Sequence, residues 1–179
     1  SVMQSVSLAD RVTVALGDGD KNTITQHFEN SLLPCDETNI CYKAAAAYLA
    51  YYGIDGYDID ITVTKNIPEA AGLAGGSADG AAVIRALDLL YDKQSSLDTL
   101  CRIGLSVGSD IPFCIVGSTA AVTGRGENVC PLAPLADERF YLVIAKSQSE
   151  SVSTREAYRR IDCGQYNGSA GTCFDSYVK

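Results

Sequence analysis

The sequence lacks a long hydrophobic run, a basic N-terminal stretch and an excess of positive charge. Its longest largely apolar stretch, around residues 44–52, is far shorter than the roughly 20 residues of a membrane-spanning helix. Residues 1–10 have neither the basic start nor the apolar centre of a signal peptide. With 14 Lys and Arg against 22 Asp and Glu, the net charge is −8, which argues against non-specific binding to nucleic acid or to an anionic membrane.

A close pair of cysteines is also missing. The seven cysteines are scattered along the chain and odd in number, which fits neither a zinc site nor a disulfide framework. We interpret them as reduced thiols, several of them buried, and therefore expect a cytoplasmic protein. They are Cys35, Cys41, Cys101, Cys114, Cys130, Cys163 and Cys173.

The remaining composition is that of a globular domain. Hydrophobic residues make up 46% of the 179 positions and charged residues 20%, so disorder is not expected. Strand and helix patterns alternate loosely, which indicates a mixed α and β class. Thr38 is the expected N-cap of the first helix and Gly53 its C′ residue. We predict strands over 2–16, 23–28, 57–64, 114–122, 128–132 and 140–145, and helices over 39–52, 77–91, 97–107 (capped by Ser96) and 153–161.

The most informative segment is the small-residue turn from Pro68 to Asp79, between a predicted strand and a predicted helix. Gly72, Gly75 and Gly76 have no Cβ, so the backbone there can approach a ligand closely. The helix that follows begins with unpaired N–H groups and a positive dipole end, which favour an anion. Neither the P-loop nor the dinucleotide fingerprint fits the order of glycines. A flexible turn packed under a helix is the alternative interpretation.

A second candidate is Asp110, within the segment Gly108–Pro112. Proline disfavours helical angles at the residue before it, so we expect Asp110 in an extended loop. A carboxylate held in this way can act as a general base toward a hydroxyl nucleophile. The alternative is an aspartate that only caps or turns the chain.

Residues 68–81 resemble the phosphate loop of the GHMP kinases, a family that includes galactokinase, homoserine kinase and mevalonate kinase. Three further motifs of that family follow in order, at 108–113, 124–127 and 152–158. The resemblance runs over essentially the whole chain. It implies an α+β fold in which residues 1–136 form a ribosomal protein S5 domain 2-like N-terminal lobe and residues 137–179 begin a ferredoxin-like C-terminal lobe.

The resemblance also implies a reaction and a set of residues. Within the family, the motifs are most similar to the kinase that uses ATP and Mg²⁺ to phosphorylate the 2-hydroxyl of a cytidine-diphosphate-linked methylerythritol in non-mevalonate isoprenoid biosynthesis. Asp110 is then the catalytic base. Ser77 also contacts the metal, and Asn39 and Lys65 lie near the adenine. For Asn39 a helix-start hydrogen bond, and for Lys65 a solvated strand end, are the alternatives. The ATP-binding residues implied are Pro68, Glu69, Ala70, Ala71, Gly72, Leu73, Ala74, Gly75, Gly76, Ser77, Ala78, Asn39 and Lys65.

The sequence departs from the family at several positions. Ala78 stands where the family has a second loop serine, and Ser147 follows Lys146 where relatives have proline. The family's catalytic lysine would precede Ser1, so we expect this chain to be a fragment that is inactive or nearly so by itself. The expected partners are ATP and a small-molecule substrate, not nucleic acid or a membrane. Another GHMP kinase, or a nucleotide-binding module without catalysis, are the alternatives.

Overall fold

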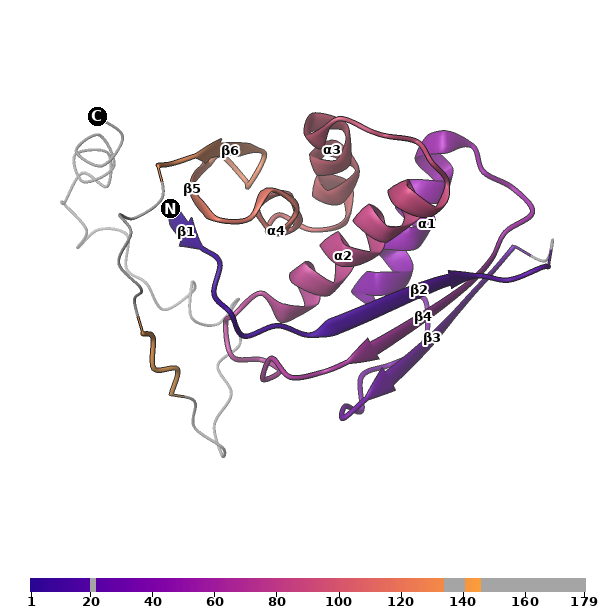
Figure 1. Cartoon of the computed structure of the whole chain (residues 1–179), viewed down its shortest axis with the longest axis horizontal. Helices are drawn as coiled ribbons and strands as arrows, with labels where there is room; N and C mark the ends of the chain where they lie inside the picture. Colours follow the sequence, from indigo (N-terminus) through magenta and orange to yellow (C-terminus); the bar gives the residue numbers. More distant parts are fainter. Residues whose placement is uncertain (20–21, 134–140, 146–179) are drawn as a thin grey trace.

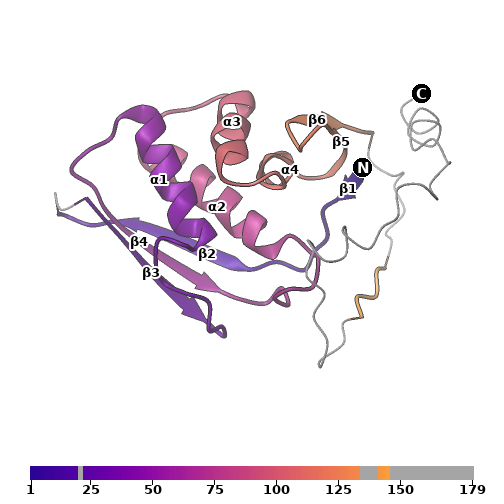
Figure 2. The ribbon, with the colours of Figure 1, turned by 180° about the vertical axis from the view of Figure 1, so that it is seen from behind.

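The computed structural model of the chain describes residues 1–19, 22–133 and 141–145. In this part of the chain, two small sheets lie at opposite ends of the molecule, with helices between them (Figure 1; Figure 2). One sheet has the order β2-β4-β3 and the other the order β1-β5-β6. The strands are β1 (Val2–Gln4), β2 (Arg11–Leu16), β3 (Thr23–Glu29), β4 (Asp58–Thr64), β5 (Thr119–Thr123) and β6 (Asn128–Pro131), and the helices are α1 (Ile40–Tyr52), α2 (Gly75–Leu90), α3 (Leu97–Val107) and α4 (Ile111–Val116).

Strand β4 is the centre of the larger sheet and confirms the strand predicted from alternation. Ile59, Ile61 and Val63 are fully buried on the face that α1 and α2 cover (Figure 1). β4 pairs antiparallel with β2 and parallel with β3. Its last pairs are Thr64 with Arg11 and Thr64 with Glu29, so the residues just before β2 meet those that follow β3 and β4 at this end of the sheet.

The prediction of one long N-terminal strand over 2–16 is wrong. The segment divides into β1 and β2, which belong to different sheets. The strand predicted at 23–28 is confirmed as β3, which lies beside β4. Alternation within a strand marks its buried face but says nothing about which strand lies beside it.

The helices at α1, α2 and α3 are confirmed, with small changes at their ends. The N-cap of α1 is Asn39 rather than Thr38, and Gly53 ends the helix in the left-handed conformation, as predicted. Ser96 caps α3 by accepting a hydrogen bond from the Thr99 amide. α2 begins at Gly75, two residues before the predicted start.

The strand predicted over 114–122 is wrong in its first part, which is helical. Pro112 lies in the first turn of α4, where its missing N–H has no intrahelical partner to lose. It therefore starts a helix instead of excluding one, and Asp110 takes a helical backbone conformation at the N-cap position. The strand proper, β5, begins only at Thr119.

Two predictions concern the end of the chain. The strand predicted over 140–145 is wrong for 141–145, which form no strand and pair with none of the described strands. A segment without a hydrogen-bonded neighbour cannot complete a ladder, whatever its composition. The helix predicted over 153–161 lies outside the described residues.

The core lies between the larger sheet and the helices. Its large, fully buried side chains include Tyr48, Ile84 and Leu87 from α1 and α2 and Ile111 and Ile115 from α4. α4 therefore packs into the same core as α2, which fixes the position of Asp110 relative to the start of α2. Among the described residues, no helix has the length and apolar character that crossing a bilayer requires.

Candidate functional site

The candidate site is centred on the loop of residues 66–74 that joins β4 to α2. Three of its residues have positive φ: Ala70, Gly72 and Ala74, at 50°, 71° and 54°. Ala74 is the N-cap of α2, and no side chain caps the helix there. The first amides of α2 are thus left for water or for a ligand, at the positive end of a long helix. This is an arrangement that binds phosphate groups.

The glycines serve this turn in two ways. Gly72 has positive φ and open space around it, so its role is conformational. Gly75 is helical, and a Cβ on it would lie 3.0 Å from Cγ2 of Ile67. The absence of a side chain at Gly75 therefore lets the entrance of the loop pack directly against the start of the helix.

The loop borders a cleft of about 410 Å³ beside the N-terminus of α1. Most of the residues predicted to bind ATP line this cleft together. Ser77 and Ala78 are not among the residues that line it, although Gly76 and Asp79 on either side of them are. Ala78 lines a second cleft of about 440 Å³, which Leu73 and Ala74 of the loop also border. The predicted residues that line the first cleft are Asn39, Lys65 and residues 68–76.

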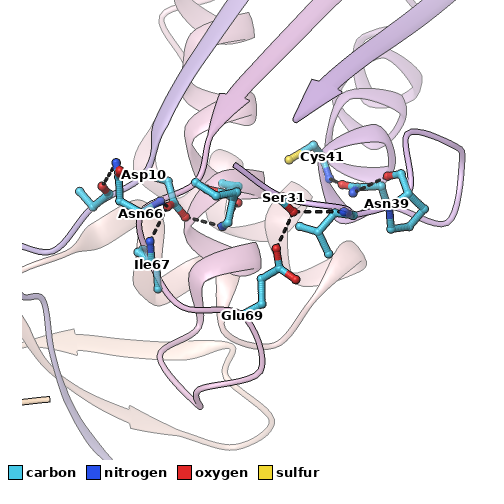
Figure 3. A network of polar contacts seen from close by, with 12 residues as sticks. Asp10, Ser31, Asn39, Cys41, Asn66, Ile67 and Glu69 are labelled. Carbon is cyan, nitrogen blue, oxygen red and sulfur yellow. Dashed lines mark hydrogen bonds and ion pairs between the residues drawn. The ribbon is translucent and has the colours of Figure 1, made fainter. Parts of the chain in front are cut away.

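Asn39 is buried at the edge of this cleft, and its amide group is already engaged. Its Oδ1 accepts a hydrogen bond from the Cys41 amide at 2.9 Å, and its Nδ2 donates to the Pro34 carbonyl at 2.9 Å (Figure 3). The alternative interpretation of Asn39, a helix-start hydrogen bond, is therefore confirmed. Its place in the cleft lining leaves the adenine contact as a prediction.

Lys65 is the centre of a buried charge cluster, which we define as Asp10, Lys65 and Asp79. The Lys65 ammonium donates to the carboxylates of both aspartates, with an Nζ–Oδ2 distance of 2.7 Å to Asp79. The side chain of Lys65 is 5% exposed and those of the two aspartates 2%. The interpretation of Lys65 as a solvated strand end is therefore wrong.

Burial and hydrogen bonding oppose each other in this cluster. Burial raises the pKa of the Asp79 carboxyl to about 6, even though Lys65 lowers it. For Asp10, burial also acts upward, but hydrogen bonds from Lys65, Ile67 and Asn66 hold its pKa below the ordinary value. Burial alone lowers the pKa of Lys65, but the two carboxylates raise it overall, so the ammonium stays charged.

Asp10 and Asp79 were not among the predicted site residues. The sequence indicates Asp79 only weakly, as a charged residue within a run of alanine and glycine that is typical of a closely packed helix face. It does not indicate Asp10, since only the pairing of β2 with β4 brings this residue opposite Lys65. Oδ1 of Asp79 is buried and has no hydrogen-bond partner among the described residues.

Asp110 lies outside the first cleft, at the start of α4. Its side chain is exposed, and no described residue forms a hydrogen bond or ion pair with its carboxylate. The next residue, Ile111, packs against α2: its Cδ1 lies 3.3 Å from the position of a Cβ on Gly80. Phe113 and Cys114 of α4 line the second cleft with Leu73 and Ala74 of the loop. α4 and the loop thus border the second cleft together, but Asp110, at the start of α4, lines neither of the two clefts.

Ser77 lies in the first turn of α2, beside the uncapped amides, and is partly exposed. It is therefore placed to offer a hydroxyl to a phosphate or to a phosphate-bound metal. No group of three or more His, Cys, Asp or Glu side chains in the described part of the chain could hold a metal ion alone. A metal at this loop would need oxygen ligands from a bound phosphate.

The comparisons with known proteins agree on one family. Residues 39–118 match the family described as "GHMP kinases N terminal domain". A 4-diphosphocytidyl-2-C-methyl-D-erythritol kinase of Bacillus licheniformis is 41% identical over 160 residues, which are 89% of this chain and 53% of that protein. Its counterpart in Synechocystis is 46% identical over 162 residues, 88% of this chain and 50% of that protein. The chain spans about half the length of the curated relatives that it matches.

Solved structures show the same relationship. A crystal structure of 4-(cytidine 5'-diphospho)-2C-methyl-D-erythritol kinase is 38% identical and matches with a TM-score of 0.56, over 71% of this chain and 43% of that one. Homoserine kinase from Cytophaga hutchinsonii matches with a TM-score of 0.60 at 24% identity, over 69% of this chain and 42% of that one. This second likeness is one of fold alone.

Proposed function

We propose that this chain, which belongs to the GHMP kinase family, is the nucleotide-binding part of an ATP-dependent kinase that phosphorylates the 2-hydroxyl of 4-diphosphocytidyl-2-C-methyl-D-erythritol. The observation that carries the proposal is the uncapped start of α2 at the end of a small-residue loop that borders a cleft. In this proposal, residues 1–136 belong to the N-terminal lobe and residues 137–179 begin the C-terminal lobe.

The nucleotide is proposed to bind along the loop of residues 68–78, with its phosphates on the free amides at the start of α2. Asn39 and Lys65 border the cleft where the adenosine would lie. Mg²⁺, bound by the Ser77 hydroxyl and the phosphates, would neutralise negative charge on the transferring group. Ala78 has no hydroxyl to add, so the backbone amides bear most of the phosphate contact.

Asp110 is proposed as the base for the acceptor hydroxyl. In the transfer step the hydroxyl oxygen forms a bond to the γ-phosphorus of ATP, and the bond from that phosphorus to the bridging oxygen of ADP breaks. The hydroxyl proton goes to the Asp110 carboxylate, which is exposed and engaged by no described side chain. Phosphoryl transfer relies on positioning and charge stabilisation more than on covalent chemistry, which suits a site built from backbone amides and one carboxylate.

The test is turnover by the full-length protein with ATP and three alcohols: 4-diphosphocytidyl-2-C-methyl-D-erythritol, homoserine and mevalonate. We expect phosphorylation of the first. Asp110→Asn should retain ATP affinity and lower kcat by about 10²-fold or more, because general-base catalysis contributes on that order. The matched control is Asp98→Asn, which removes an exposed carboxylate on α3 and should leave kcat as in the wild type.

Other results of these measurements would contradict the substrate, the reaction or the role of Asp110. Turnover of homoserine or mevalonate in place of the cytidyl alcohol would indicate another GHMP kinase. ATP binding without phosphate transfer would indicate a nucleotide-binding module. An Asp110→Asn variant with the kcat of the wild type would remove Asp110 from the mechanism. A cytoplasmic setting, and the inactivity of the 179-residue chain by itself, stay predictions.

A further inference from the structure

We propose that the buried charge cluster of Asp10, Lys65 and Asp79 acts as a staple that holds the entrance and the exit of the phosphate loop together and so sets the affinity for the nucleotide. The three side chains are positioning residues in this proposal: they act through the loop backbone and do not touch the transferring phosphate. The inference rests on the proposed function for its ligand, ATP, but its structural part can be measured without any ligand.

The sheet brings the first two members together. β2 begins at Arg11, which pairs with Thr64 at the end of β4. Asp10 and Lys65 are the next residues outward on each strand, so the antiparallel pairing places them at the same point. The contact therefore lies where the chain leaves the sheet and enters the loop.

Asp10 holds the entrance of the loop. Its Oδ1 accepts hydrogen bonds from the amides of Asn66 at 2.5 Å and Ile67 at 2.7 Å, the first two residues after Lys65 (Figure 3). The side-chain amide of Asn66 also donates to the Ala9 carbonyl at 3.0 Å. Both of the first loop amides are thus satisfied by one carboxylate, and their positions are fixed relative to β2.

Lys65 connects this entrance to the exit. Its ammonium reaches Asp79, 14 positions along the chain and within the first turns of α2. The same nitrogen lies 3.5 Å from the position of a Cβ on Gly75, the first residue of α2. The ammonium therefore lies beside the first residue of α2, where the end of the loop comes close to its beginning.

The charge balance shows that Lys65 holds protein groups rather than a free anion. Two of its three ammonium protons are engaged by Asp10 and Asp79, and its side chain is 5% exposed. With both aspartates ionised, the cluster bears one surplus negative charge, which would repel a phosphate instead of attracting it. Burying three charged groups is costly unless each is paired, so apolar residues would serve a purely hydrophobic core better. The cluster adds a fixed geometry to the loop that apolar contacts do not supply.

The experiment compares Lys65→Met with the matched control Lys93→Met in the full-length protein. Lys93 is an exposed lysine outside the cluster, so its variant controls for the loss of one positive charge. Without nucleotide, amide hydrogen exchange should be faster at Asn66, Ile67 and residues 75–77 in Lys65→Met but not in Lys93→Met. With nucleotide, the Kd and KM for ATP should rise about tenfold, the loss of about one charge-assisted hydrogen bond, and far more than kcat falls.

A second variant decides the matter if Lys65→Met does not fold. Asp79→Asn has the same shape and keeps an oxygen that can accept from Lys65, so it preserves the packing while weakening the staple. We expect the same changes in exchange at residues 75–77 and a rise in Kd of about threefold. Unchanged exchange together with an unchanged Kd would overturn the proposal. Faster exchange in a protein that does not bind ATP would keep the staple and overturn the proposed function instead.

Discussion

Replacing Gly104 by alanine should destabilise the chain through the helix that carries Asp110. Gly104 is buried on α3 and faces α4. A Cβ on it would lie 2.6 Å from Cγ2 of Ile111 and 3.0 Å from Cδ1 of Ile115. Both isoleucines are fully buried, so neither can move aside without displacing the core. The new methyl group must push α4 away from α3.

The expected loss follows from two opposing terms. Alanine in place of glycine within a helix stabilises it by about 1 kcal/mol. An extra methyl group in a packed core costs about 1–3 kcal/mol, and a contact as short as 2.6 Å at Gly104 places this case near the upper end. We therefore expect the free energy of unfolding to fall by about 1–2 kcal/mol.

The assay is urea unfolding followed by circular dichroism, with Gly80→Ala as the matched control. Gly80 is also a buried helical glycine beside Ile111, but a Cβ there would lie 3.3 Å from Cδ1 of Ile111. This contact needs only a small adjustment, so the control should be as stable as the wild type or more stable by up to about 1 kcal/mol. A Gly104→Ala variant at least as stable as Gly80→Ala would refute the packing described for α3 and α4.

Two other predictions concern the edge of the site. Asn39→Ala should lower the free energy of unfolding by about 1–2 kcal/mol, because it removes the N-cap of α1 and a hydrogen bond to the Pro34 carbonyl. Urea unfolding measures this loss, and an unchanged midpoint would contradict the capping role. Burial raises the pKa of Asp79 from 3.8 to about 6, so the folded chain binds this proton more tightly than the unfolded chain. The free energy of unfolding of the wild type, measured relative to that of Asp79→Asn, should therefore fall by up to about 3 kcal/mol as the pH rises from about 4 to about 7. If this difference does not change with pH, Asp79 does not titrate in this range.

The predicted class and fold are confirmed: the structure has mixed helices and sheets, and residues 39–118 match the GHMP kinase N-terminal domain. Local patterns were sufficient for β4, where alternation marks the buried face, and for α3, where Ser96 marks the start. They failed at α4, because the rule that proline disfavours a helix at the preceding residue does not hold in a first turn. The loop could be predicted from its glycines, because a residue without a Cβ lets the backbone approach a neighbouring group closely, whatever that group is.

By itself, then, the sequence indicated β4, the helices α1, α2 and α3, the glycine-rich loop and the candidate base at Asp110, because each depends on residues that are neighbours in the chain. Only the tertiary structure decided that β4 lies between β2 and β3, and that Asp10 thereby meets Lys65. It also decided that Lys65 is buried against Asp79 rather than solvated. Contacts of this kind join residues that are far apart in sequence, and no local periodicity or propensity specifies which charges meet when strands pair and a helix packs over their ends.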